Sequence, residues 1–384
     1  MRKLKRQSVQ ATARASGRRS GRLDTPANPE SSTSDASAAM VALIEASWLS
    51  KAIYVVASLG IPDLIDDRPK RSEELAVLTG THAQSLHRIM RALVVHDIFT
   101  VDQLDRFCLT PLGATLRTDV PGSLRDWALL MLGTVNQAAW GEIIYTMRTG
   151  GSAFQRRHGV DLWQYQANDH EYAGLFAAAM ASFTATYINS VLGCYRFAPL
   201  RRIVDVGGGD GSLLIGILQQ YPEIKGVVFD LPEIVDRAKQ RINEVGLSNR
   251  CDAACGDALV EVPSGGDAYI LSRVLHDWDD ESARRILTNC RNALPVDGRI
   301  LVIERAMPDN LTALNAARTP ALSDITMTDL NMMVMTSGRE RTIAEYQDLF
   351  GAVGLELSRV VPTDTAMNVI ELRALSRWAP EECD

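Results

Sequence analysis

The sequence has no clustered set of cysteine and histidine residues that would bind a structural metal ion. Its six cysteines are scattered and form no CxxC pair. Cys251 and Cys255 are close together, but no histidine or further cysteine nearby completes a zinc site. We therefore predict reduced cysteines. With 384 residues, of which 46% are hydrophobic, the chain is long enough for two or three domains whose cores need no disulfide.

A long apolar run and an excess of positive charge are also missing. No apolar run approaches the roughly 20 residues that span a membrane. The start MRKLKRQSVQ is not followed by the apolar segment of a secretory signal. The formal net charge of -7 disfavours a nucleic-acid partner. We predict a cytoplasmic protein that binds neither nucleic acid nor a membrane.

The segment 1–38 has few large apolar side chains and many Arg, Ser, Ala and Thr residues. Such a segment buries too little apolar surface to offset the entropy lost on ordering. We predict that it is a disordered basic tail. Binding of a polyanion to its arginines is the alternative function.

Residues 39–120 have the pattern of a mainly helical, winged-helix-like domain. MVALIEASWLSKAIYVVASLGI has apolar residues at helical spacing, two shorter helical segments follow, and FTVDQLDRFCLTPLG is typical of a two-stranded wing. Winged helices often bind DNA, but Asp102 and Asp105 make this wing acidic. The first helix has a broad apolar face, so we predict that this domain forms a homodimer.

The second half of the chain predicts an α/β fold. Residues 121–198 have helical patterns rich in Trp, Phe, Met and Tyr, which are expected to form core or the wall of a pocket for a flat ligand. From residue 199 to 384, β-branched strands alternate with helical segments, which indicates a parallel sheet. The terminal stretch LELSRVVPTDTAMNVIELRA predicts an antiparallel hairpin that closes the sheet.

A glycine-rich loop follows the first of these strands in IVDVGGGDGSLL. Glycine allows the backbone to turn tightly and to approach a ligand without a Cβ, which points to Gly207 and Gly209. We include Asp205, at the end of the strand, in the predicted cofactor site. Nicotinamide enzymes share such loops, but the spacing here lacks the last glycine of the G-x-G-x-x-G fingerprint.

Further polar residues follow the next strands in order. Asp230 ends the second strand in FDLP, where a carboxylate accepts the two hydrogen bonds of a ribose diol. Leu231 follows it in the predicted cofactor set. Asp257 lies in GDAL, placed to accept from an adenine amino group, with Ala258 beside the base, and Ser272 ends the fourth strand. The carboxyl ends of parallel strands share one edge of a sheet, where open α/β folds bind ligands.

A histidine flanked by two carboxylates is the candidate catalytic group. His276 follows the fourth strand in LHDWDDE, Glu304 ends the fifth strand in LVIER, and Glu340 lies in GRERT. This arrangement suits a general base whose imidazolium must be stabilised. No clustered ligand set predicts a metal ion, so we expect none.

These motifs resemble those of the plant-type small-molecule O-methyltransferases and their actinobacterial relatives in antibiotic biosynthesis. DVGGGDG, FDLP, GDAL, LHDWDDE, GRILVIE and GRERT occur in order. The resemblance implies an N-terminal dimerisation domain, a Rossmann-like methyltransferase domain and an obligate homodimer. It implies S-adenosylmethionine as cofactor, bound by Gly207, Asp230, Asp257, Ala258 and Ser272. It also implies that His276 is the base and that Glu304 and Glu340 support it.

The predicted function is methylation of a hydroxyl, expected to be phenolic, on a small aromatic secondary metabolite. We predict that Asn331 and Met335, from the helix TDLNMMVM, line the acceptor pocket together with Met180 and Phe183. The alternatives are a nicotinamide oxidoreductase, a DNA-binding regulator that senses a cofactor, and a relative of this fold that has changed its reaction to hydroxylation or decarboxylation. The chain has His276 as a candidate base, which favours methylation over these changed reactions.

Overall fold

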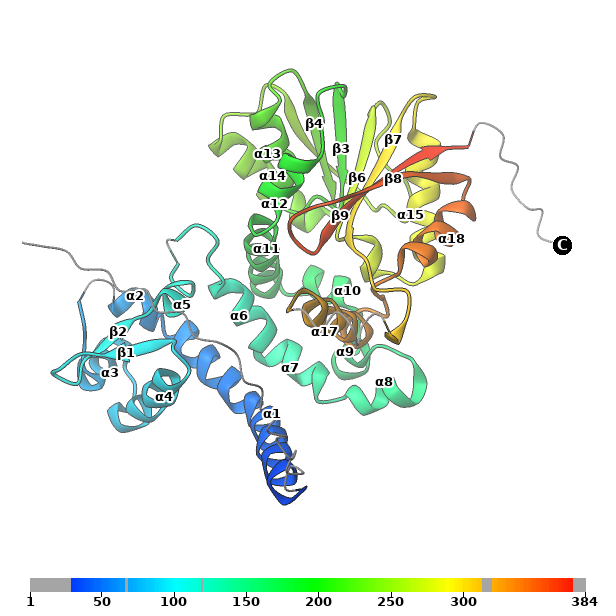
Figure 1. The fold of residues 1–384 in the computed structure, drawn as a ribbon. Helices are drawn as coiled ribbons and strands as arrows, with labels where there is room; N and C mark the ends of the chain where they lie inside the picture. The colour runs from blue at the N-terminus through cyan, green and yellow to red at the C-terminus, as the bar shows by residue number, and fades with distance from the viewer. Residues whose placement is uncertain (1–28, 66–67, 119, 313–319, 376–384) are drawn as a thin grey trace, which may run out of the picture. The chain divides into compact units, whose positions relative to one another are not determined.

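Seven strands in the second half of the chain form one sheet in the computed structural model (Figure 1), which describes residues 29–65, 68–118, 120–312 and 320–375. Their order across the sheet is β5-β4-β3-β6-β7-β9-β8. The strands are β3 (Arg202–Val206), β4 (Lys225–Asp230), β5 (Cys251–Cys255), β6 (Ala268–Ser272), β7 (Arg299–Arg305), β8 (Leu355–Pro362) and β9 (Met367–Ala374).

The first five strands are parallel, and the last two form an antiparallel hairpin at one edge. The predicted parallel sheet with a closing hairpin is therefore confirmed. Strand β3 lies between β4 and β6. The chain adds β4 and β5 on one side of β3 and then crosses to add β6 on the other side. A crevice opens at such a reversal, outside the carboxyl ends of the strands. The loop after β3 carries the predicted glycines.

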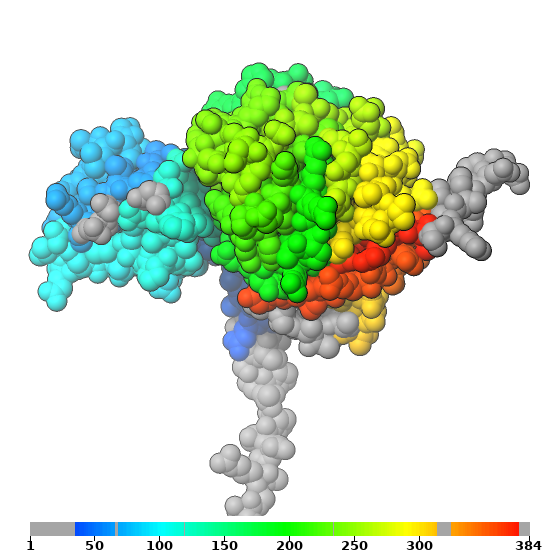
Figure 2. Space-filling model, turned by 90° about the horizontal axis from the view of Figure 1, so that it is seen from above, coloured from blue at the N-terminus to red at the C-terminus, as the bar shows by residue number. Residues whose placement is uncertain are grey.

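Helices cover both faces of the sheet because residues in its central strands are apolar on both sides. Ile203 and Val204 are neighbours in β3 but belong to different cores. Helices α12 (Ile188–Cys194), α13 (Ser212–Gln220) and α14 (Pro232–Glu244) contribute to one core, and α15 (Asp280–Ala293) and α18 (Ile343–Gly351) to the other. In the space-filling view the green, yellow and red segments form one continuous body (Figure 2).

Residues 121–198 are helical, as expected. Helix α17 (Pro320–Met335) packs against α7, α8 and α9, although it is distant from them in sequence. Leu130, Phe154 and Met335 belong to their common buried core. The helices are α6 (Arg125–Leu132), α7 (Thr134–Trp140), α8 (Ile143–Thr149), α9 (Ala153–His158), α10 (Leu162–Asn168) and α11 (His170–Ala185).

The N-terminal part has the predicted helices and wing. Strand β1 (Phe99–Val101) pairs antiparallel with β2 (Phe107–Leu109), and Leu75, Met90 and Phe107 share a buried core. The helices are α1 (Pro29–Ser58), α2 (Ile61–Ile65), α3 (Ser72–Thr79), α4 (Ala83–Val95) and α5 (Pro111–Ala114).

Helix α1 differs from the boundary that we placed after residue 38, because it begins at Pro29. Proline is tolerated in the first turn of a helix, and the alanines of DASAAM are strong helix formers. The predicted tail before this proline lies outside the described residues.

Helix α1 also exposes a set of large apolar side chains. Trp48 is 69% exposed and Leu43 is 70% exposed. The segment Asp35–Ser58 has a mean hydropathy of 1.5 over its most apolar part and is long and apolar enough, by length and composition alone, to cross a membrane. From the sequence we expected no apolar run of the length that spans a membrane, and this helix differs from that expectation. An apolar surface of this kind is typical of a helix that packs against another chain.

Candidate active site

A cavity of about 700 Å³ lies at the carboxyl ends of β3, β4 and β6. The loops after these strands line it together with helices that include α6, α7, α10, α11 and α17. Apolar and aromatic side chains such as Trp127, Trp163 and Phe176 contribute to the wall. The cavity is large enough for a cofactor and a flat aromatic molecule together.

The loop after β3 turns through two glycines whose backbone is left-handed. Gly207 has a φ of 68° and Gly209 a φ of 60°. A Cβ on Gly207 would lie 2.7 Å from Cγ2 of Val274, whereas nothing lies within 4 Å of a Cβ on Gly209. Gly207 is therefore needed both for its dihedral angle and for close packing, and Gly209 leaves open space at the cavity.

Asp205 lies beneath this loop with a carboxylate that lacks a partner. Within the described chain neither of its oxygens has a hydrogen bond, and the residue is only 1% exposed. Burial, together with the nearby carboxylates of Asp230 and Asp210, raises the pKa of Asp205 to about 8. A buried acceptor without a donor costs free energy, so the position fits a bound group that donates hydrogen bonds.

The carboxylate of Asp230 organises the same loop from the end of β4. Its Oδ2 accepts a hydrogen bond from the backbone N–H of Gly209 at 2.7 Å, and its Oδ1 accepts one from Leu231 at 2.7 Å. Each carboxylate oxygen has a further lone pair for a ligand hydroxyl. Asp257 and Ala258 lie on the cavity wall beyond β5, as the sequence predicted.

Ser272 ends β6 and forms a contact that the sequence did not indicate. Its hydroxyl lies 3.0 Å from that of Tyr187, which precedes α12 and also lies 3.4 Å from the hydroxyl of Thr184. All three residues line the cavity. Tyr187 lies 85 positions before Ser272 in the chain. Only the packing of the helices before the sheet brings the two hydroxyls together.

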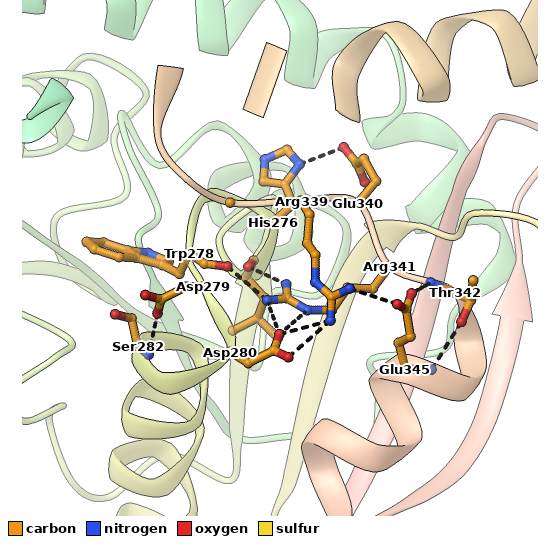
Figure 3. Close-up of polar contacts among 12 residues, drawn as sticks. His276, Trp278, Asp279, Asp280, Ser282, Arg339, Glu340, Arg341, Thr342 and Glu345 are labelled. Atoms are coloured by element: carbon orange, nitrogen blue, oxygen red, sulfur yellow. Dashed lines mark hydrogen bonds and ion pairs between the residues drawn. The ribbon is translucent and has the colours of Figure 1, made fainter. Parts of the chain in front are cut away.

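His276, Glu304 and Glu340 come together from three segments of the chain. The Nδ1 atom of His276 lies 2.8 Å from Oε1 of Glu340 (Figure 3) and 3.7 Å from Oε2 of Glu304. Oε1 of Glu304 also accepts hydrogen bonds from the backbone N–H groups of Leu275 at 3.0 Å and His276 at 3.4 Å. Nε2 of His276 lies 3.7 Å from Oδ1 of Asp277, and both residues line the cavity.

The electrostatics of this cluster favour a charged imidazole. Burial lowers the pKa of His276, but the carboxylates of Glu304, Glu340 and Asp277 outweigh it and raise the pKa to about 9. Burial raises the pKa of Glu304 to about 7 even though His276 opposes the shift. Burial also acts to raise the pKa of Glu340, but the imidazolium of His276 holds it below its usual value. The pair of His276 and Glu340 is thus an imidazolium and a carboxylate at neutral pH.

Arg341 holds the loop of Glu340 against the loop of His276. Its guanidinium is fully buried and donates to the backbone oxygens of Leu275 and Trp278, each at 2.8 Å, and to the carboxylate of Asp280 (Figure 3). The two backbones are so close that a Cβ on Gly338 would lie 2.0 Å from the backbone oxygen of His276. The distance between His276 and Glu340 therefore depends on these two residues.

Three of the four residues that we predicted for the acceptor wall line the cavity. Met180, Asn331 and Met335 line the cavity, and Oδ1 of Asn331 accepts a hydrogen bond from the indole N–H of Trp140 at 3.1 Å. Phe183 is not part of the lining. Its ring stacks on Trp127 instead, with ring centroids 4.9 Å apart.

Comparison with known proteins connects this geometry to a family. Residues 140–356 match the model of the O-methyltransferase domain, and residues 41–119 match that of the O-methyltransferase dimerisation domain. The chain belongs to the O-methyltransferase family. The match to the dimerisation domain supports assembly as a homodimer.

Three similar members of this family show its chemical range. The chain is 37% identical to a phenazine O-methyltransferase of Lysobacter antibioticus, over 88% of this chain and 96% of that protein. It is 34% identical to a phenazine-1-carboxylate N-methyltransferase of Pseudomonas aeruginosa, over 86% and 96% of the two chains. A solved O-methyltransferase of neocarzinostatin biosynthesis, in complex with S-adenosylmethionine and 2-hydroxy-5-methyl naphthoic acid, is 32% identical with a TM-score of 0.73, over 85% and 96%. The chain is therefore a methyltransferase of small aromatic secondary metabolites.

The cofactor of this methyltransferase is S-adenosylmethionine, and the residues of the chain fit that molecule. Asp205 offers two buried acceptor atoms to the amino group of the methionine part, which carries a positive charge. Asp230 would hold the ribose hydroxyls, and Gly209 leaves room above the loop. Asp257 and Ala258 would flank the adenine. Each of these assignments to a residue is a prediction of this structure.

The unpartnered Asp205 leads to a prediction about stability. In the folded cofactor-free protein its pKa is raised from 3.8 to about 8, so the folded state binds more protons than the unfolded state between these values. Stability should therefore fall as the pH rises through that window. The free energy of unfolding of Asp205→Asn should exceed that of wild type by about 1–3 kcal/mol, so the variant should unfold at a higher temperature. The difference in free energy should grow from pH 5 to pH 8.

Thermal unfolding at several pH values, with Asp252→Asn as a control for loss of a surface charge, would measure this effect. The same Asp205→Asn variant should bind S-adenosylmethionine more weakly. A difference in stability that does not change with pH would show that Asp205 is ionised, and has a partner, in the folded protein.

The three residues of the catalytic cluster could also be considered as metal ligands. One ligand atom from each of His276, Glu304 and Glu340 lies within 4.8 Å of the others. We nevertheless expect that activity persists after treatment with a strong chelator, because Nδ1 of His276 already contacts Glu340 at 2.8 Å. A metal ion at Nδ1 would replace that contact. Loss of activity that magnesium or zinc restores would contradict this expectation.

Proposed function

We propose that the protein transfers a methyl group to a hydroxyl, most simply a phenolic one, and that His276 is the general base. The observation that carries the proposal is the placement of the buried imidazole of His276. Its Nδ1 atom contacts Glu340, and His276 lines the cavity. A base held from one side and open to substrate on the other is the arrangement that general-base catalysis needs. Glu304 and Glu340 stabilise the imidazolium.

The proton balance of the proposed reaction is simple. S-adenosylmethionine supplies an electrophilic methyl group and leaves as S-adenosylhomocysteine. Nε2 of neutral His276 takes the proton of the acceptor hydroxyl as the new O–C bond forms. A phenol has a pKa of about 10. The raised pKa of His276, about 9, therefore makes this transfer nearly balanced in free energy. Met180, Asn331 and Met335 form the proposed wall that holds the aromatic ring.

N-methylation is the second reaction to weigh, because two of the similar proteins are named for it. A neutral ring nitrogen has a free lone pair and loses no proton when it is methylated, so it has no need of a base. The buried cluster around His276 costs free energy to maintain, since it holds several ionisable groups away from water. This cost is understandable if a proton must be removed, which favours a hydroxyl acceptor.

Matched acceptors test the proposed reaction. The holoenzyme would be incubated with S-adenosylmethionine and a series of hydroxylated benzoates, naphthoates and phenazines, together with the same ring systems without a hydroxyl. The mass of each product and its fragmentation locate the methyl group. We expect methyl ethers from the hydroxylated series. Methylation at nitrogen or carbon, with no ether from any member, would overturn the proposal.

We also propose that the enzyme is a cytoplasmic homodimer that binds neither nucleic acid nor a membrane. The exposed apolar side chains of α1 are Met40, Val41, Leu43, Ile44 and Trp48. They lie mostly within the stretch that matches the dimerisation domain, and burial against a second chain would remove them from water. Light scattering of the purified protein should give twice the chain mass of 42.1 kDa. A stable monomer, or a protein recovered only from membranes, would contradict this assembly.

A further inference from the structure

Arg273 has an unusual backbone conformation directly after β6. Its φ of 55° is in the left-handed region, although it is not glycine. A residue with a side chain pays about 1 kcal/mol or more for this conformation, and such strain is concentrated at functional sites. The backbone N–H of Arg273 donates to the oxygen of Ile303 at 3.0 Å, which fixes the residue at the end of the strand. The side chain lines the cavity, three positions before His276.

The guanidinium of Arg273 has no anionic partner in the part of the chain that the structure describes. Its one hydrogen-bond contact is from Nη1 to the sulfur atom of Met180, at 3.5 Å. The Cζ atom of the guanidinium lies 4.4 Å from the ring centroid of Phe183. The carboxylates of Asp277, Glu304 and Glu340 act on it only at longer range, and each of them faces His276 more closely. A partly buried positive charge without an anion is costly, because it has lost water and gained little in return.

Arg305 differs from Arg273 in this respect. It also lies over the ring of Phe183, at 5.1 Å, but its Nη2 pairs with Asp324 at 2.8 Å and its Nη1 donates to Thr328 at 2.6 Å. Among the described residues, Arg305 therefore has an anionic partner and Arg273 has none. The ring of Phe183 contacts the guanidinium of Arg273 in a cation–π arrangement and is not part of the cavity lining.

We propose that Arg273 binds a carboxylate of the acceptor, so that the substrates of this enzyme are aromatic hydroxy acids. The inference rests on the proposed function and names the chemical class of its acceptor. A guanidinium matches a carboxylate with two parallel hydrogen bonds, and this pairing would neutralise the unpaired charge. Arg273 and His276 belong to one short loop. The carboxylate and the reacting hydroxyl therefore belong to the same ring or to fused rings.

The carboxylate of the methionine part of the cofactor is a second source of the same chemistry. The surroundings of Arg273 favour the acceptor, because the contacts of its side chain are with Met180 and Phe183 on α11, beside the acceptor wall. Among the described residues, the side chain of Arg273 makes no hydrogen bond with the glycine loop after β3. The two sources are separated by measuring cofactor affinity and acceptor affinity in the same variants.

The experiment compares Arg273→Met and Arg273→Lys with wild type and with Arg284→Met. Arg284 is an exposed residue on α15 outside the cavity, so its replacement controls for loss of one positive charge. Calorimetry would measure the binding of 1-hydroxy-2-naphthoate, 3-hydroxybenzoate and a hydroxyphenazine carboxylate to the enzyme saturated with S-adenosylhomocysteine. Each acid is paired with the same phenol without its carboxyl group. This binding requires no methyl transfer.

We expect wild type to bind at least one acid roughly 10- to 100-fold more tightly than its matched phenol. Arg273→Met should remove that preference while leaving the affinity for the phenol within about threefold. Arg273→Lys should restore part of the preference, and Arg284→Met should resemble wild type. The affinity for S-adenosylmethionine should be the same in all four proteins.

Three outcomes would overturn the inference. They are the absence of any preference for an acid in wild type, equal losses for acid and phenol in Arg273→Met, and a loss of cofactor affinity that matches the loss of acid binding. Failure of the proposed function is recognised separately. If the acids bind through Arg273 but no methyl ether forms, the carboxylate site stands and O-methylation does not. If wild type and Arg273→Met methylate phenols and acids alike, O-methylation stands and the carboxylate site does not.

Discussion

Replacement of His276 by alanine should slow methyl transfer by roughly 10²–10⁴, the usual contribution of a general base. The variant should fold, because the cavity lies beside His276 and tolerates a smaller side chain, and it should bind S-adenosylmethionine as wild type does. Glu304→Gln should cause a smaller loss, since Glu304 holds the backbone N–H groups of Leu275 and His276 and stabilises the imidazolium without contacting the acceptor.

The pH dependence gives this prediction a sharper form. The neutral imidazole is the active form, and the pKa of His276 is about 9, so kcat/KM of wild type should rise about tenfold per pH unit below that value and then level off. A phenolate needs no base. The rate of His276→Ala should therefore approach that of wild type as the pH nears the acceptor pKa of about 10.

Rates measured by mass from pH 6.5 to pH 10, together with calorimetric cofactor affinities, would test both statements. Near wild-type turnover of His276→Ala at neutral pH would remove the histidine from the mechanism and leave positioning alone as the source of catalysis. A constant deficit at every pH would assign His276 a structural role, because a lost base is compensated at high pH and a lost scaffold is not.

Replacement of Asp230 by alanine should weaken S-adenosylmethionine binding by roughly 10²–10⁴. Two charge-assisted hydrogen bonds to the ribose would be lost, each of about 1.5–3 kcal/mol. The glycine loop would also lose an anchor, because Oδ2 of Asp230 accepts from the backbone N–H of Gly209. Asp230→Asn retains one acceptor atom and should show an intermediate loss.

Calorimetric titration of the cofactor into each folded variant measures these losses. Asp236→Ala is the matched control, because Asp236 lies on the adjoining helix α14 with its side chain 84% exposed and pairs only with Lys239 among the described residues. The control should bind the cofactor as wild type does. Unchanged affinity in Asp230→Ala would mean that the ribose lies elsewhere and that Asp230 serves only to shape the loop.

Two features of the site show where a sequence is not sufficient. The fully buried Arg341 lies in the motif GRERT, but nothing in that motif tells which of its charged residues will be buried and which exposed. Arg339, two positions earlier, pairs with Asp280 and Glu345 at the surface. Burial of one and exposure of the other follow from the loop after β6, whose backbone oxygens need a donor.

The sequence by itself determined the order of the strands along the chain, the glycine loop and the polar residues at the strand ends. It could do so because these signals are local: alternation of strands and helices predicts a parallel sheet, and parallel strands end at one edge. The sequence therefore predicted that His276, Asp230 and Asp257 lie at one edge of the sheet, and all three line the cavity. The family motifs added the identity of the cofactor.

Tertiary structure alone decided which of these groups have partners. The pairing of Ser272 with Tyr187 depends on side chains brought together from distant segments. The same is true of the Asp205 carboxylate and the Arg273 guanidinium, which have no hydrogen-bond donor and no anion, respectively, among the described residues. Phe183 lies outside the cavity lining for the same kind of reason, because its ring packs against Trp127 and Arg273. Desolvation and pairing depend on every neighbour of a group in space, and a sequence gives only its neighbours along the chain.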